Sequence, residues 1–314
     1  MCPLCESPAV TVGGPGQRTV YRSRVPLGEA ICNRPAVPAS DRVSGDHGAV
    51  PVWTPYPALD AVLRRLLDGV RTALDECLLG AYLQGSFAVG DADEHSDVDF
   101  IVATTAALSP DQVDGLQLFH AALFDAGPEW ARHLEGSYIP CEILRHPGRA
   151  GEPVWYLDHG SRSLQPDSHC NTVVVRWILR EHGVVLTGPH PQDLIDPIGV
   201  ADLRAEIIRD IDDWGGEILD RPDRYRNRFY QSFIVLNLAR MLHDLGTGTV
   251  GSKRTGAEWA KTALGSRWAG LNDRAWAGRP DPARAVREPA DESDFALTLD
   301  LVREVMARAG RADR

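Results

Sequence analysis

Residues 85–102 read Gly-Ser-Phe-Ala-Val-Gly-Asp-Ala-Asp-Glu-His-Ser-Asp-Val-Asp-Phe-Ile-Val, and this stretch decides the fold. A Gly-Ser turn, Gly85-Ser86, precedes two aspartates one residue apart, Asp97 and Asp99. Because side chains alternate between the two faces of a strand, both aspartates point to the same face. Val98, Phe100 and Val102 point to the opposite face, which suits a core. The stretch therefore predicts a strand that begins with paired carboxylates.

The paired carboxylates and the turn together predict a site for a metal-bound triphosphate. Two hard carboxylates side by side at a strand end, Asp97 and Asp99, suit Mg²⁺. The Gly85-Ser86 turn offers backbone N–H groups and a hydroxyl to a phosphate. This combination indicates phosphoryl or nucleotidyl transfer assisted by two metal ions.

The composition of the chain narrows the class of protein. A chain of 314 residues with 43% hydrophobic content can bury two modest cores. Its formal net charge of −11, from 44 acidic and 33 basic residues, disfavours a nucleic-acid partner, because phosphates need a basic surface. No apolar run approaches the roughly 20 residues of a membrane span, and no signal peptide is visible. We therefore expect a cytoplasmic, monomeric enzyme with no nucleic-acid or membrane partner.

Residues 1–50 are expected to form a poorly ordered N-terminal extension. They are rich in Pro, Gly, Ser and Arg and show no sustained hydrophobic period. Cys2 and Cys5 are spaced like one half of a zinc-binding motif. Cys32 and His47 would bring the number of candidate ligands to four. This spacing fits no standard zinc finger, so the extension receives no role. Six cysteines in a chain of this length do not indicate a disulfide framework, and reduced thiols are expected.

Residues 51–197 read as an α/β domain. Apolar residues at three- and four-residue steps predict a helix from Ala58 to Leu74. The remaining patterns predict strands at 81–83, from Asp97 onward and at 134–139, and helices at 109–124 and 169–182. This order favours a small mixed sheet with helices on one side of it.

Residues 198–314 read as an all-α domain. Turn clusters at Gly188-Pro189 and Asp196-Pro197 place the domain boundary near residue 197. Beyond it the periodicity predicts a helical bundle with helices at about 200–219, 227–245, 253–264 and 293–309. The segment from Arg279 to Glu288 is rich in Pro and Arg, which indicates a loop.

Metal-assisted nucleotidyl transfer also needs a base that deprotonates the acceptor hydroxyl. Two glutamates are candidates, because Glu135 opens the strand that follows the aspartates and Glu142 comes just after that strand. Taken alone, each of them also fits a solvated glutamate at a strand end. The residue pattern by itself therefore leaves the choice between them open.

The stretch from Gly85 to Val102 resembles the signature of the polymerase-beta-like nucleotidyltransferase superfamily. Two other stretches resemble one branch of it, the aminoglycoside 3″-adenylyltransferases, which inactivate streptomycin and spectinomycin. The first runs from Asn171-Thr172 to Gly188-Pro189, and the second contains Asn237-Leu238-Ala239-Arg240, Gly251-Ser252-Lys253 and Ala257-Glu258-Trp259. The resemblance spans roughly residues 60–275 in patches.

The resemblance implies a role for each matched residue. It implies that Asp97 and Asp99 hold two Mg²⁺ ions and that Ser86, next to Gly85, contacts the triphosphate of ATP. It selects Glu135 as the catalytic base. It also implies that Arg240 and Lys253 reach the ATP phosphates from the second domain; a guanidinium fork and an ammonium are a usual pair for a triphosphate.

The match is incomplete at the acceptor. The family binds the antibiotic with an aspartate and tryptophans on the second-domain wall of the cleft. The aspartate position falls on Tyr230 here, whereas Trp214 matches one of the tryptophans. A missing carboxylate matters for a polycationic ligand, because buried polar recognition depends on each partner. Other carboxylates are available to replace it: Asp210, Asp212 and Asp213.

These observations predict a Mg²⁺-dependent adenylyltransferase that moves AMP from ATP to a hydroxyl of a small, cationic, aminoglycoside-type acceptor. Two alternatives stay open. In one, the same chemistry acts on another metabolite or a protein side chain, as Tyr230 favours. In the other, the chain is a nucleotide-binding regulator without transfer activity. The presence of Glu135 beside both aspartates argues against a regulator, because a binding module needs no base.

Overall fold

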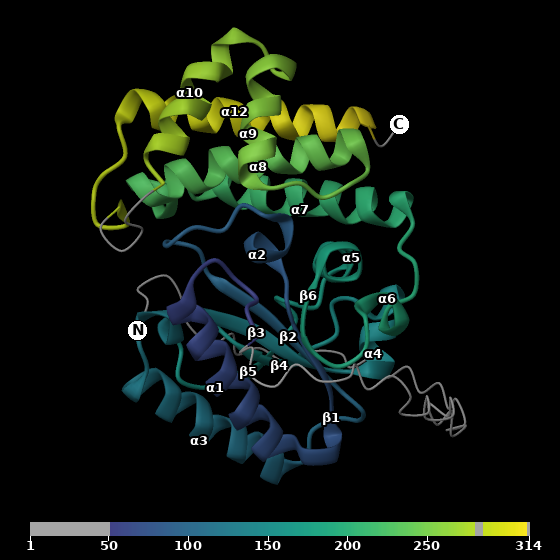
Figure 1. Ribbon diagram of the computed structural model, residues 1–314. Coiled ribbons are helices and arrows are strands. Elements are labelled where there is room, and N and C mark those ends of the chain that lie inside the picture. Colours follow the sequence, from purple (N-terminus) through teal and green to yellow (C-terminus); the bar gives the residue numbers. More distant parts are fainter. Residues whose placement is uncertain (1–50, 280–284, 313–314) are drawn as a thin grey trace, which may run out of the picture.

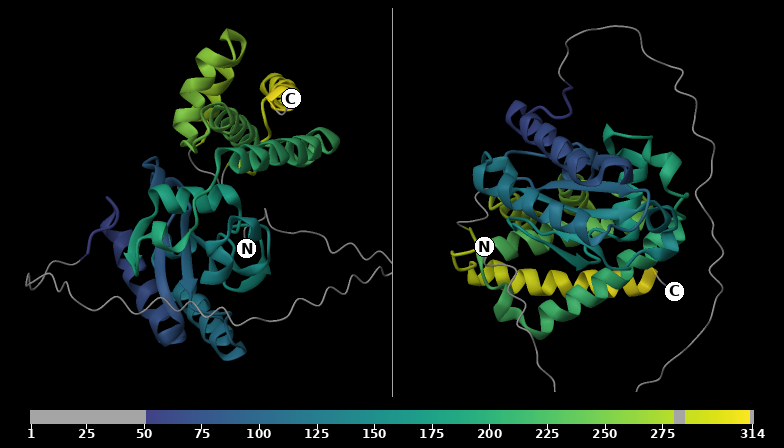
Figure 2. Two further views of the ribbon diagram at one scale, coloured as in Figure 1. Left: turned by 90° about the vertical axis from the view of Figure 1, so that its right-hand side faces the viewer. Right: turned by 90° about the horizontal axis from the view of Figure 1, so that it is seen from below.

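The computed structural model describes residues 51–279 and 285–312 (Figure 1). The expected N-terminal extension, with its cysteines, lies outside these residues, as does part of the expected loop from Arg279 to Glu288. Figures 1 and 2 show a region built on a sheet and a region of helices that lies against one end of it. The division into two domains at residue 197 stays a prediction.

A six-stranded mixed sheet forms the first region, in the order β5-β4-β3-β2-β1-β6. Its strands are β1 (Leu78–Leu83), β2 (Val98–Thr104), β3 (Leu134–Pro140), β4 (Val154–Leu157), β5 (Leu164–Asp167) and β6 (Val184–Thr187). β2 and β3 are parallel, whereas the other neighbours are antiparallel. The sequence predicted β1, β2 and β3. It missed β4, β5 and β6 because runs of four residues carry too little pattern to be recognised.

Helices cover both faces of this sheet, so the prediction of helices on one side was wrong. α1 (Pro57–Leu74) and α3 (Pro110–Ala126) pack on the face of Val98, Phe100 and Val102. The opposite face is covered by α4 (Cys141–Arg145), α5 (Val173–His182) and α6 (Pro191–Leu194). The error arose because α4 and α6 are single turns whose few apolar residues give no helical period.

Side-chain caps set where the helices of this region begin. α3 has the predicted capping box: Ser109 Oγ accepts a bond from the Gln112 N–H at 3.3 Å, and Gln112 Oε1 accepts one from the Ser109 N–H at 2.9 Å. α5 begins at Val173 and not at the expected residue 169. The reason is that Thr172 is its N-cap, with a hydroxyl that accepts a bond from the Val175 N–H at 3.1 Å.

The short helix α2 (Gly85–Val89) lies between the sheet and the helical region (Figure 1). Ala88 and Val89 pack against the core of the helical region. Gly90 ends the helix with a φ of 77°, in the left-handed region that favours glycine. The Gly-Ser turn expected from the sequence is therefore the first turn of a five-residue helix.

Five helices form the second region within the described residues: α7 (Val200–Asp220), α8 (Arg228–Thr247), α9 (Lys253–Ala263), α10 (Ser266–Ala277) and α12 (Glu292–Ala312). α8 supplies the centre of their core through Leu236, Leu238 and Ala239. The sequence predicted four of these helices and missed α10. Only two residues separate α10 from α9, and Gly265, at a φ of 92°, makes the break between them.

Four short 3₁₀ helices complete the described chain: η1 (Asp75–Cys77), η2 (Glu129–Arg132), η3 (Pro147–Arg149) and η4 (Pro222–Tyr225). None of the described helices has the length and apolar character needed to span a membrane.

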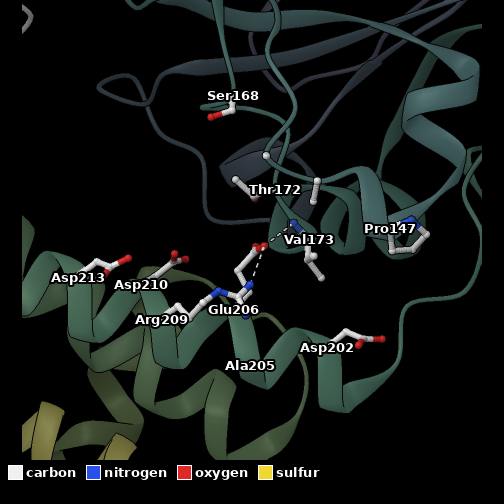
Figure 3. A pocket seen from close by; sticks show the side chains of 13 residues that line it. Pro147, Ser168, Thr172, Val173, Asp202, Ala205, Glu206, Arg209, Asp210 and Asp213 are labelled. Carbon is white, nitrogen blue, oxygen red and sulfur yellow. Dashed lines mark hydrogen bonds and ion pairs between the residues drawn. The ribbon is translucent and has the colours of Figure 1, made fainter. Parts of the chain in front are cut away.

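One carboxylate, that of Glu206 on α7, fastens the helical region to α5 (Figure 3). It accepts hydrogen bonds from the backbone N–H groups of Val173 at 3.0 Å and Val174 at 2.8 Å. A negative charge is favourable there, because the N–H groups of the first helical turn have no partner within the helix. This contact joins the two regions beside a cavity of about 480 Å³ that Val173 and Glu206 line.

Candidate active site

Asp99 and Glu135 lie opposite each other across the parallel strands β2 and β3. Residues paired in this way present their side chains to the same face, so both carboxylates line one cavity. Asp97 precedes β2 by one residue and lines the cavity as well. The structure therefore brings together the three carboxylates that the sequence singled out.

These carboxylates form a cluster of like charge. Burial, followed by the charges of Glu135 and Asp97, raises the pKa of Asp99 to about 7. Burial also acts to raise the pKa of Asp97, but contact with His159 outweighs it and the pKa is lowered. A divalent cation would relieve the repulsion, and carboxylate oxygens are the ligands that Mg²⁺ prefers. The donor set therefore fits Mg²⁺.

Gly85 allows α2 to begin directly against this cluster. Its φ is 58°, and a Cβ at this position would lie 2.0 Å from Asp99 Oδ2. Any other residue would have to displace the carboxylate. The backbone N–H of Gln84 donates to the Asp99 carbonyl at 2.9 Å, which fixes the approach, and Ser86 lines the cavity.

Glu135 is held by a side chain of the neighbouring strand β4 and by one that follows β5. The Tyr156 hydroxyl donates a hydrogen bond to Oε1 at 2.8 Å, and His169 Nε2 lies 3.3 Å from the same oxygen. The bond to Glu135 raises the pKa of His169. By contrast, the other candidate base, Glu142, has a side chain that is 79% exposed and pairs with Arg149 on the surface. Of the two candidates, only Glu135 lines the cavity.

Arg240 on α8 and Lys253 at the start of α9 enter the same cavity from the helical region. α8 and α9 pack closely, since a Cβ on Gly256 would lie 2.4 Å from Arg240 Cα. Burial lowers the pKa of both basic groups, and the charge of Arg240 lowers that of Lys253 further. The charges of Asp97 and Asp99 act in the opposite direction on Lys253. Two cations thus face the carboxylate cluster.

The cavity that these residues line has a volume of about 1000 Å³. Aromatic side chains of α8, Phe229, Tyr230 and Phe233, form part of its wall. Tyr230 therefore occupies the wall where the resemblance placed an acidic contact. Trp214 packs against Phe233, with ring centroids 5.8 Å apart.

The carboxylates of α7 do not replace that acidic contact in the large cavity. Asp210 and Asp213 line a second cavity of about 480 Å³, between α7 and the loops around Pro147 and Ser168 (Figure 3). Asp212 is exposed on the same helix. The expectation that these residues contact the acceptor beside Tyr230 therefore does not fit their positions.

Known proteins resemble this chain in both sequence and fold. A family model described as aminoglycoside adenylyltransferase, C-terminal domain, matches residues 193–295. The aminoglycoside (3″)(9) adenylyltransferases of Klebsiella pneumoniae, Shigella flexneri and Escherichia coli are each 25% identical to this chain over 217 residues. That alignment covers 66% of this chain and 79% of each relative. These matches support the resemblance of the chain to the aminoglycoside adenylyltransferases and its assignment as a nucleotidyltransferase.

A solved structure also matches this nucleotidyltransferase. It is the crystal structure of the spectinomycin adenyltransferase AAD(9) from Enterococcus faecialis with ATP and spectinomycin. The TM-score is 0.56 at 14% identity, and the match covers 80% of this chain and 98% of that one. At this identity the likeness bears on the fold, and it confirms the predicted mixed sheet followed by a helical region.

Besides His95, three histidines that sequence reasoning missed line the cavity of this nucleotidyltransferase. His133 directly precedes β3, His159 follows β4, and His169 follows β5. A lone histidine has no spacing pattern that distinguishes it from a core or surface residue. One signal was available for His133, since it stands two residues before Glu135.

Proposed function

We propose that this enzyme transfers AMP from ATP to a hydroxyl group of an aminoglycoside-type acceptor, with Mg²⁺ in the carboxylate cluster. One observation carries the proposal: Asp97, Asp99 and Glu135 line the same cavity as Arg240 and Lys253. The curated relatives support the acceptor class, since they are named as aminoglycoside adenylyltransferases. Such a transfer would inactivate an antibiotic acceptor.

ATP is bound between the two regions in this proposal. Arg240 and Lys253 contact its phosphates from the helical side, and the Gly85-Ser86 step contacts them from the sheet side. A guanidinium and an ammonium that are partly buried bind phosphate strongly, because less water competes with the ligand. Asp97 and Asp99 would hold Mg²⁺, which neutralises phosphate charge and helps to orient the transferred group.

Glu135 is the general base of the proposed reaction. Tyr156 and His169 both contact Oε1, which leaves Oε2 without a hydrogen-bond partner among the described residues. Glu135 accepts the proton of the acceptor hydroxyl as that oxygen attacks the α-phosphorus in line. The bond between the α-phosphorus and the bridging oxygen breaks, and pyrophosphate leaves. The products are an adenylylated acceptor and pyrophosphate.

The acceptor lies between the aromatic wall of α8 and the sheet. Phe229 and Tyr230 offer ring faces to a sugar or cyclitol, and Asp158 and Asp167 line the same cavity from the ends of β4 and β5. A cationic acceptor is attracted both to ring faces and to carboxylates. Tyr230 favours a second candidate, an acceptor hydroxyl on an uncharged metabolite.

A pyrophosphate-release assay tests the proposal. The purified enzyme is supplied with ATP, Mg²⁺ and one of streptomycin, spectinomycin or an uncharged cyclitol, with the Glu135→Gln variant as control. We expect release that requires an aminoglycoside, Mg²⁺ and Glu135. Expression in a sensitive bacterium should then raise tolerance to the same compound. Release with the uncharged cyclitol alone favours the second candidate, and no release with any acceptor refutes the transferase assignment.

A further inference from the structure

Asp97, His133 and His159 form a cluster at one edge of the sheet. An oxygen of Asp97 and one ring nitrogen of each histidine lie within 4.8 Å of one another. Asp97 precedes β2, His133 precedes β3 and His159 follows β4 by two residues. Because β2 and β3 are parallel and β4 is antiparallel to β3, these three chain positions meet at the same edge. Three neighbouring strands thus contribute one ligand each.

The cluster contains a nitrogen that lacks a protein partner. His133 Nδ1 is buried and makes no hydrogen bond within the described part of the chain. His159 Nδ1 is also buried and lies 2.8 Å from Asp97 Oδ1. Buried polar atoms in native proteins are nearly always satisfied, so this imidazole nitrogen is available to a bound ion or water molecule. The opening between these atoms faces the large cavity, which all three residues line.

The two imidazoles are also held in place. Their ring centroids are 5.4 Å apart with the planes perpendicular, and Trp130 packs against His133 at 5.6 Å. Val98, next to Asp97, donates its backbone N–H to the His133 carbonyl at 2.7 Å, which ties the two ligand-bearing segments together. Ligands that are fixed by such surrounding contacts bind a metal with less loss of side-chain freedom.

We propose that Asp97, His133 and His159 bind a divalent transition-metal ion of the Zn²⁺ class. Mg²⁺ prefers oxygen ligands, whereas imidazole nitrogen suits Zn²⁺ and its first-row neighbours. One carboxylate and two histidines leave further coordination positions open toward the cavity, as in catalytic zinc sites. Asp97 is then shared between this ion and the Mg²⁺ held with Asp99. The inference rests on the proposed function only in placing Asp97 at a metal centre.

Cobalt binding without nucleotide tests the inference on the full-length protein. The protein is stripped of metal with a chelator and titrated with Co²⁺, a spectroscopic substitute for Zn²⁺, while visible absorption and heat are recorded. We expect a visible absorption band typical of nitrogen-ligated Co²⁺ that Zn²⁺ abolishes and that equal Mg²⁺ does not. His133→Asn and His159→Asn should each weaken Co²⁺ binding at least about tenfold.

His169→Asn is the matched control, because His169 lines the same cavity outside the cluster. It should leave the Co²⁺ titration unchanged. Equal Co²⁺ affinity in the wild type and in the double variant of His133 and His159 would overturn the inference, as would full displacement of Co²⁺ by equal Mg²⁺. Melting temperatures measured without metal establish that the variants are folded. If the wild-type protein binds Co²⁺ as expected but transfers no AMP, the result counts against the proposed function alone.

Discussion

Asp91 and Arg254 are joined by two hydrogen bonds although they stand 163 residues apart in the chain. The backbone N–H and the Nε–H of Arg254 each donate to the Asp91 carboxylate at 3.1 Å. The Arg254 guanidinium also stacks on Trp276, and Arg279 stacks on the same ring while contacting Asp93. The loop that contains Asp91 and Asp93 and precedes Asp97 is therefore bound to the helical region next to Lys253.

Releasing this loop should impair ATP binding more than folding. We expect Arg254→Ala to raise the KM for ATP and to lower kcat, because Asp97 and Lys253 lose their common support. The free energy of unfolding should change by less than about 1 kcal/mol, since the Arg254 side chain is 65% exposed and exposed ion pairs contribute little. Steady-state kinetics and urea unfolding measure both effects.

Arg267→Ala is the control for this experiment. Arg267 is 58% exposed, stacks on Trp268 and pairs with Asp300, so it has the same kinds of contact away from the metal loop. Its loss should leave the kinetics unchanged. If Arg254→Ala and Arg267→Ala behave alike, the contact with Asp91 does not support the site.

Neutralising either aspartate should abolish metal-dependent turnover. We expect Asp97→Asn or Asp99→Asn to lower kcat at least about a hundredfold, because a bound ion contributes several kcal/mol of charge stabilisation. The melting temperature of metal-free Asp99→Asn should not fall at pH 8, since the ionised carboxylate is buried among like charges. Near-normal turnover of either variant at saturating Mg²⁺ would refute the metal assignment.

Substitution of Glu135 should reduce adenylyl transfer far more than substitution of Glu142. Glu135→Gln should remove transfer while leaving the affinity for ATP almost unchanged, because a base acts only in the chemical step. Glu142→Gln should behave like the wild type, since the Glu142 side chain is 79% exposed and pairs with Arg149. Single-turnover assays and ATP-binding calorimetry separate the two effects. A larger loss for Glu142→Gln than for Glu135→Gln would contradict the choice of base.

The residues whose positions could be predicted from the sequence are those with a local signal. The spacing of Asp97 and Asp99 within one strand fixes their common face, whatever the rest of the chain does. The position of Glu135 at the start of the next strand made it one of two candidates, the resemblance selected it over Glu142, and the structure pairs it with Asp99. The resemblance supplied Arg240 and Lys253, which no local pattern distinguishes from surface cations.

The features that the sequence missed depend on tertiary contacts. The cluster of His133 and His159 with Asp97 exists only because three strand ends meet at one edge of the sheet. The contact between Arg254 and Asp91 depends on how the helical region packs against α2 and the loop that follows it. Neither has a spacing that a hydrophobic or motif pattern records.

Loss of the Lys253 side chain should weaken the binding of ATP more than the binding of the acceptor. Its ammonium lines the cavity beside Arg240, and its pKa responds to Asp97 and Asp99. We expect Lys253→Ala to raise the KM for ATP at least about tenfold, the loss of one charged hydrogen bond, with a smaller effect on the KM for the acceptor. Lys261→Ala, eight positions along α9 and paired with Glu258 and Asp273, is the control. A larger effect on the acceptor would place the triphosphate elsewhere.

Asp210, which lines the second cavity, should make the free energy of unfolding depend on pH (Figure 3). Burial, with the charges of Glu206 and Asp213, raises the pKa of Asp210 from 3.8 to about 6, while Arg209 offsets part of this effect. Between these two values the folded protein binds more protons than the unfolded chain. The contribution of Asp210 to the free energy of unfolding therefore decreases as the pH rises from about 4 to about 6.

Replacing Asp210 with asparagine should remove that pH dependence. The amide cannot ionise, so Asp210→Asn should gain stability relative to the wild type as the pH is raised from about 4 to about 7. Urea unfolding at several pH values in this range measures the difference between the two proteins. Asp212→Asn is the control, because Asp212 is exposed on the same helix, and its difference from the wild type should stay constant. A constant difference for Asp210→Asn as well would show that Asp210 titrates alike in the folded and unfolded chains.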